Sequence, residues 1–203
     1  MEKSRPERGL SMNICVFGAS ADKLDPAYFA AAEELGALLH ALGHRLIYGG
    51  GKAGLMGACA RGVIRAGGRP LGIAPRFFDE PGILDHEGAE LLFTETMAER
   101  KSLMLESAEA FIALPGGIGT LDEFFEALTL RQLGQHGKPI VLLNTLGFYD
   151  ALDALLRSLA LDGFMSAQVL EAYALCASPA EALRRVCAPA ADRLPRTLSA
   201  YNA

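Results

Sequence analysis

The stretch 115–123 combines residue types suited to binding a phosphate with a carboxylate that a phosphate does not need. It contains Gly116, Gly117, Gly119 and Thr120. An apolar run precedes the glycines and apolar residues at helical spacing follow them, so we expect a strand-to-helix turn. Such a turn directs unpaired backbone N–H groups and the positive end of the helix dipole at one point, where an anion, most naturally a phosphate, would bind. Glu123, one helical turn later, would repel that phosphate and therefore indicates chemistry elsewhere on the ligand.

Two cations form a second group of interest. Arg100 and Lys101 lie near the start of an expected helix, where positive charge opposes the helix dipole, which suggests an anionic ligand nearby. A solvated, charged helix face would account for them equally well. Asp122 and Glu123 have a similar structural alternative, because acidic residues stabilise the first turn of a helix.

The elements that must position these residues alternate along the chain. Strand-like apolar runs alternate with helical patterns, which predicts a Rossmann-like, doubly wound parallel sheet in a three-layer α/β/α arrangement. We expect one domain over 12–188, a disordered leader at 1–11, a loose tail at 189–203 and a loop near the site at 77–88. The expected strands cover 12–17, 45–48, 70–74, 90–93, 110–114, 138–144 and 171–175.

Three turns follow expected strands, at 18–20, 49–54 and 115–123, and all three could line one cleft at the carboxyl edge of the sheet. Ser20, Gly50 and Gly51 are therefore candidate ligand contacts. The second turn does not match a triphosphate-binding loop, because that motif needs glycine at 46 and Ser or Thr at 53, where the chain has Leu46 and Ala53. A tight turn that serves only helix packing is the alternative for 49–54.

Composition excludes several classes of function. The net charge of −5 provides no basic footprint for nucleic acid, and no apolar run is long enough to span a membrane. The 4 cysteines form no CxxC pair and lie in apolar segments, which favours buried free thiols in a reducing cytoplasm. No set of His, Cys, Asp and Glu has the spacing of a metal site.

Two motifs together resemble a known family. Met97-x-x-Arg100-Lys101, followed by the glycine turn that ends at Glu123, is similar to the Lonely Guy (LOG) family of cytokinin riboside 5'-monophosphate phosphoribohydrolases, which were often mislabelled lysine decarboxylases. The similarity extends from about 13 to 188. It includes the turn 48–51, Gly54-Leu55-Met56-Gly57, and Lys138-Pro139 with Asn144.

The resemblance implies hydrolysis of the N-glycosidic bond of a nucleoside 5'-monophosphate, either a cytokinin riboside 5'-monophosphate or AMP, by a homodimer that needs no cofactor. It implies that Arg100 and Glu123 are catalytic. Because arginine holds its proton too tightly to be a general acid, its expected role is orientation and charge stabilisation. The expected substrate contacts are Ser20, Gly50, Gly51, Lys101, Gly116, Gly117, Ile118, Gly119, Thr120 and Thr129.

The chain departs from the family pattern at four positions that concern the fit around the base: Ala98, Ile118, Asp122 and Leu130. Glu80 or Glu87 could supply a further acid from the loop 77–88. A non-enzymatic carrier of a nucleotide or cofactor in the same cleft is the alternative function. A lysine decarboxylase is disfavoured, because no lysine lies in a recognisable pyridoxal-phosphate motif.

Overall fold

All seven strands of the central sheet run parallel in the computed structural model, which describes residues 11–188. Their order across the sheet is β4-β3-β2-β1-β5-β6-β7. The strands are β1 (Asn13–Phe17), β2 (Arg45–Tyr48), β3 (Leu71–Pro75), β4 (Glu90–Thr94), β5 (Ala110–Ala113), β6 (Ile140–Leu143) and β7 (Ala174–Cys176). The order reverses between β1 and β5, which pair directly with Ile14 opposite Ala110.

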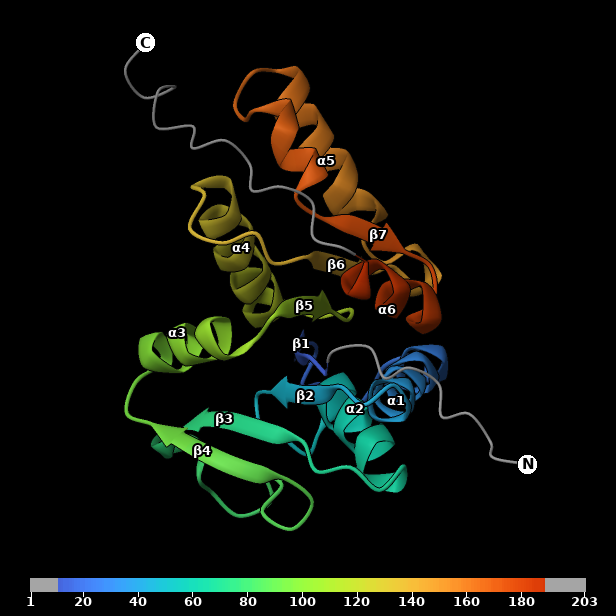
Figure 1. The fold of residues 1–203 in the computed structure, drawn as a ribbon, viewed down its shortest axis with the longest axis vertical. Helices are drawn as coiled ribbons and strands as arrows, with labels where there is room; N and C mark the ends of the chain where they lie inside the picture. Colours follow the sequence, from blue (N-terminus) through green and yellow to red (C-terminus); the bar gives the residue numbers. More distant parts are fainter. Residues whose placement is uncertain (1–10, 189–203) are drawn as a thin grey trace, which may run out of the picture.

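Helices cover both faces of this sheet (Figure 1). α1 (Pro26–Ala41), α2 (Gly54–Arg65) and α6 (Pro179–Cys187) pack on one face, and α3 (Met97–Ser107), α4 (Ile118–Gln132) and α5 (Asp150–Leu161) pack on the other. Short 3-10 helices are η1 (Arg76–Phe78), η2 (Thr145–Gly147) and η3 (Ala167–Glu171).

The two faces form two separate hydrophobic clusters, because successive side chains of a strand point in opposite directions. In β1, Ile14 and Val16 join the cluster under α1, α2 and α6, whereas Cys15 and Phe17 join the one under α3, α4 and α5. All four side chains are almost completely buried. The predicted doubly wound, three-layer fold is therefore confirmed.

Most predicted elements agree with the structure to within two residues at each end, but the last predicted strand was wrong over its first half. Glu171 ends the 3-10 helix η3, and only Ala174–Cys176 pairs with β6. Tyr173 is nevertheless buried, and its hydroxyl donates to Asp153 Oδ1 at 2.7 Å. The apolar run thus reflects burial without strand pairing.

The cysteine prediction holds for three of the four residues. Cys15, Cys59 and Cys176 are buried free thiols, whereas Cys187 is exposed at the end of α6. The predicted leader at 1–11, apart from its last residue, and the predicted tail at 189–203 lie outside the described residues. Within the described part of the chain, no helix has the length and apolar character to cross a membrane.

Candidate active site

A cleft of about 340 Å³ opens where the strand order reverses. The turns after β1 and β5 border it, as expected at the carboxyl edge of a doubly wound sheet. The lining residues come from these two turns, η1 and the first turns of α2, α3 and α4: Gly18, Ala19, Ser20, Met56, Phe78, Met97, Arg100, Gly117, Ile118, Gly119, Thr120, Asp122 and Glu123.

The amino end of α4 opens into this cleft. Gly117 is the N-cap residue and forms no side-chain capping bond, and the first helical bond runs from Leu121 N to Gly117 O at 3.1 Å. The backbone N–H groups of residues 118–120 precede that bond, so they have no acceptor within the helix. Thr120 is only 4% exposed, and its hydroxyl side packs against Gly116. This end of α4 is suited to an anion.

Arg100 and Glu123 form a buried ion pair at the edge of the cleft. Arg100 Nη1 donates to Glu123 Oε1 at 2.6 Å, and the two side chains are 7% and 10% exposed. Arg100 Nε also donates to the carbonyl of Ile73 at 3.0 Å, which fixes the guanidinium to β3. The two residues that the sequence singled out as catalytic are thus in direct contact, although they belong to different helices.

The electrostatics of Glu123 are set by two opposing influences. Burial raises the pKa of Glu123 above its ordinary value of 4.5, and the positive charge and hydrogen bond of Arg100 partly oppose that rise. A carboxylate with a raised pKa is a better proton acceptor than an exposed one, and it remains beside a fixed positive charge. The pair therefore places a basic carboxylate oxygen in the same cleft as the open amino end of α4.

Gly49 makes room for the arginine, which sequence reasoning missed. A Cβ at position 49 would lie 2.5 Å from Arg100 Nη2 and 3.2 Å from Met56 Sδ. Only glycine leaves space for the guanidinium at this point. Three successive glycines signal a close approach in the turn after β2, but they do not reveal which glycine is approached or by what.

Five of the predicted contacts lie outside the lining of the cleft: Gly50, Gly51, Lys101, Gly116 and Thr129. The carbonyl of Gly50 accepts from Asp85 N at 3.0 Å, and Gly51 pairs with Leu84, so this turn is engaged by the loop 77–88. Thr129 is exposed on α4. Contact between these residues and a substrate stays a prediction.

Lys101 points to its neighbours on α4. Its Nζ lies 2.9 Å from Asp122 Oδ2 and 2.8 Å from Glu126 Oε2. These hydrogen bonds to Glu126 and Asp122 raise the pKa of Lys101. The lysine therefore ties α3 to α4 beside the Arg100–Glu123 pair, and Asp122 has a partner other than a ligand.

The second helix that begins near the cleft, α2, already has acceptors for its first amides. Gly54 N donates to Asp22 Oδ1 at 2.8 Å, and Leu55 N donates to Ala19 O at 2.8 Å. A Cβ at Gly54 would lie 2.2 Å from Ala19 O, so glycine permits this close contact with the turn after β1. Gly54 therefore serves the packing of α2 against the turn after β1.

Apolar side chains also line the cleft. Met56, Phe78, Met97 and Ile118 line it, and Ile118 is 84% exposed. Phe78 belongs to the loop 77–88 that was expected near the site, but the residue itself was not predicted; it lines the cleft because η1 follows β3 directly. Glu80 and Glu87 are exposed and lie outside the lining.

Within residues 11–188, no group of three or more His, Cys, Asp or Glu side chains is arranged to hold a metal ion. Among the described residues that line the cleft, none is a lysine. Pyridoxal phosphate binds covalently to a lysine side chain, so the residues of this cleft do not fit that cofactor.

Fold and site together define an α/β protein with a cleft at the topological switch point and the open amino end of α4 within it. Solved structures show the same fold: a molybdenum cofactor binding protein from Rippkaea orientalis has a TM-score of 0.66 at 22% identity, covering 86% of this chain and 94% of that one. A molybdenum cofactor carrier protein from Chlamydomonas reinhardtii also has a TM-score of 0.66, at 23% identity, covering 86% and 95%.

Sequence comparisons identify the family. Residues 56–186 match the family described as "possible lysine decarboxylase". The chain is 41% identical over 158 residues to the cytokinin riboside 5'-monophosphate phosphoribohydrolase of Mycobacterium tuberculosis, covering 78% of this chain and 84% of that protein. It is 39% identical over 176 residues to the protein of the same name from Mycobacterium marinum, covering 87% and 93%. The chain belongs to this family, the LOG family.

Proposed function

We propose that the protein hydrolyses the N-glycosidic bond of a nucleoside 5'-monophosphate and releases the free base and ribose 5-phosphate. The observation that supports this most directly is the buried Arg100–Glu123 pair beside the open amino end of α4. Relatives at about 40% identity have names that state this reaction for cytokinin riboside 5'-monophosphates.

The 5'-phosphate would bind at the start of α4. The backbone N–H groups of residues 118–120 and the hydroxyl of Thr120 would donate to its oxygens, and the helix dipole would favour its charge. Gly117 and Gly119 leave this approach open, because a Cβ at either position would have no atom within 4 Å. Ser20 would contribute from the turn after β1.

Glu123 would act at C1' of the ribose. As the bond from C1' to the base nitrogen breaks, its electron pair leaves with the base and positive charge develops at C1', which the carboxylate stabilises. Water then forms the new bond to C1', and Glu123 accepts a proton from it. The proton balance closes when the released base nitrogen is protonated. Hydrolysis of this kind requires no redox step.

Arg100 would hold Glu123 in place and keep it ionised. Its bonds to Ile73 O and Glu123 Oε1 leave the guanidinium fixed, so it provides positive charge near the departing base without transferring a proton. Catalysis by such a pair depends on preorganisation, because the charges are in position before the substrate arrives.

The base would lie against the apolar wall formed by Met56, Phe78, Met97 and Ile118. This wall would accept either plain adenine or an adenine with an apolar N6 substituent. A panel assay decides between them: incubation with AMP and with isopentenyladenosine monophosphate, followed by chromatography of the released base. Release of neither base at high enzyme concentration would contradict the proposed function.

The carrier alternative rests on the fold alone, because the named carriers share less than 25% identity with this chain. It predicts ligand retained through purification and no base release from any nucleoside monophosphate. Mass spectrometry of the denatured protein, run beside the panel assay, separates the two functions.

We further propose a homodimer in the cytoplasm. Met97, Ile118 and Phe125 are apolar residues on α3 and α4 that are 38%, 84% and 36% exposed, and a second copy would cover them. Light scattering after size-exclusion chromatography tests the dimer. The free thiols Cys15, Cys59 and Cys176 suit a reducing compartment.

A further inference from the structure

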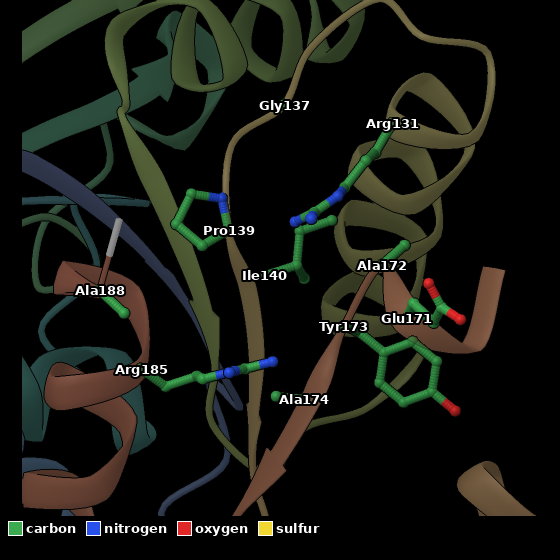
Figure 2. Close-up of a pocket in the computed structure, with 10 residues that line it drawn as sticks. All are labelled: Arg131, Gly137, Pro139, Ile140, Glu171, Ala172, Tyr173, Ala174, Arg185 and Ala188. Atoms are coloured by element: carbon green, nitrogen blue, oxygen red, sulfur yellow. The ribbon is translucent and has the colours of Figure 1, made fainter. Parts of the chain in front are cut away.

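A second, smaller pocket lies at the opposite edge of the sheet from the cleft, where β6 and β7 begin (Figure 2). Its volume is about 70 Å³. Two arginines enter it from different helices: Arg131 from the last turn of α4, and Arg185 from α6. The rest of the lining is Gly137, Pro139, Ile140, Glu171, Ala172, Tyr173, Ala174 and Ala188.

Arg131 is a buried cation with an unused donor. The residue is 6% exposed, and its Nη1 donates to the carbonyl of Lys138 at 2.7 Å. Its Nε is buried without a hydrogen-bond partner. The contact with Lys138 explains why an arginine stabilises the end of α4, but it leaves the Nε–H unaccounted for, and buried donors in native proteins are normally bonded.

The charge around this donor is positive. Among the described residues, neither Arg131 nor Arg185 forms an ion pair with a carboxylate, although Glu171 lies at the rim. Figure 2 shows the Arg131 side chain ending beside Ile140 and the Arg185 side chain ending near Ala174. The Glu171 carboxylate is turned away from both guanidinium groups. Burial and the positive charge of Arg185 lower the pKa of Arg131. An anion between the two arginines would stabilise the charged form of Arg131 and so oppose that lowering.

We propose that this pocket binds an oxyanion, a phosphate or a carboxylate group, between Arg131 and Arg185. Planar guanidinium groups match the paired oxygens of such groups. A volume of about 70 Å³ holds roughly two waters, which suits the anionic group and excludes a whole nucleotide. The site is separate from the cleft, which lies at the carboxyl edge of the sheet.

Two sources could supply the anion: free phosphate, or the carboxylate of Asp192, which lies four positions beyond Ala188 and is the only acid in 189–203. Thermal unfolding of the full chain in inorganic phosphate, against chloride at equal ionic strength, tests both. Arg185→Gln is the test variant and Arg184→Gln the matched control, because Arg184 is its exposed neighbour, loses the same charge and lies outside the pocket lining.

Any phosphate bound in the cleft stabilises both variants equally, so their difference reports the pocket alone. We expect Arg184→Gln to keep the phosphate-dependent rise in melting temperature and Arg185→Gln to lose at least half of it, with an apparent affinity at least tenfold weaker. Arg131→Lys, which keeps the charge but removes the Nε–H donor, should show the same loss.

If the two variants differ only after Asp192→Asn is added, the oxyanion is the carboxylate of Asp192, and the site stands. If Arg184→Gln and Arg185→Gln respond equally to phosphate both with and without Asp192→Asn, the pocket binds no oxyanion and the proposal is wrong.

Discussion

Glu123 receives its hydrogen bond from Arg100 across the junction of two helices, at 2.6 Å and with both side chains about nine-tenths buried. A third element fixes the geometry, since the arginine is also bonded to the carbonyl of Ile73 in β3. Residues from α4, α3 and β3 thus converge on one carboxylate.

Replacing Glu123 by Gln should lower kcat for a nucleoside monophosphate by about 10²- to 10⁴-fold, because the amide can neither stabilise positive charge at C1' nor accept a proton. Binding of the monophosphate should change little, since the anion site is at the start of α4. Glu126→Gln is the matched control, on the same helix but outside the cleft lining. Steady-state base release and calorimetry measure the two effects; equal activity of the two variants would refute the role of Glu123.

Activity should rise with pH through the pKa of Glu123, with a midpoint above 4.5, because only the ionised carboxylate is active. Stability should change in the opposite sense. A carboxyl with a raised pKa binds its proton more tightly in the folded state, so the folded protein loses stability as pH rises from about 4.5 through that pKa. The free energy of unfolding of the wild type minus that of Glu123→Gln, measured in urea across this range, should therefore fall as pH rises.

Removing the guanidinium by Arg100→Met should destabilise the protein by about 3–5 kcal/mol at neutral pH, because Glu123 would remain buried without a counter-charge. The double variant Arg100→Met with Glu123→Met should recover most of that loss, since no charge is then left in the apolar surroundings. Urea unfolding of the four proteins forms a double-mutant cycle. Additive effects of the two changes would mean that the pair is not coupled.

Gly49→Ala should reduce kcat by about 10²-fold and lower stability by less than Arg100→Met does, because the new methyl group would displace the Arg100 side chain without removing its charge, and Glu123 would shift with it. Gly51→Ala provides the comparison, since its Cβ would meet no atom closer than 3.9 Å. A loss confined to Gly49→Ala isolates the space needed by the arginine. Comparable losses in both variants would instead support direct contact between Gly51 and the substrate.

Thr120→Val should raise KM for a nucleoside monophosphate by about tenfold, the value of one hydrogen bond to a charged group, and leave KM for the unphosphorylated nucleoside unchanged. The hydroxyl is buried beside Gly116 at the start of α4, and valine has nearly the same shape. An equal change in KM for both substrates would show that Thr120 does not contact the phosphate.

The sequence was sufficient to predict the layered parallel fold and to single out Arg100 and Glu123, because both leave local patterns: alternating apolar runs, and two motifs with fixed spacing. It did not predict that the two side chains form an ion pair. It was insufficient for Gly49, Phe78 and the ion pairs of Lys101. The contacts of these residues depend on how β3, η1, α3 and α4 pack against one another. The sequence pattern of a single segment does not contain this information.

The turn 49–54 likewise has a contact with a distant segment that its own sequence does not record. Its glycines have the composition of a ligand-binding loop, yet Gly54 serves the contact between α2 and the turn after β1, and Asp22 accepts the amide of Gly54. That acceptor lies 32 positions earlier in the chain, so the turn itself does not record it.

That contact also limits which nucleotides the cleft can distinguish. At the start of α2, Asp22 and the Ala19 carbonyl already accept from the first amides, whereas the amides of residues 118–120 at the start of α4 have no acceptor within the helix. A phosphomonoester has one charged group for this single receptor. Because the occupied end of α2 offers no second binding site for a phosphate, we expect a nucleoside monophosphate to be hydrolysed in preference to ADP.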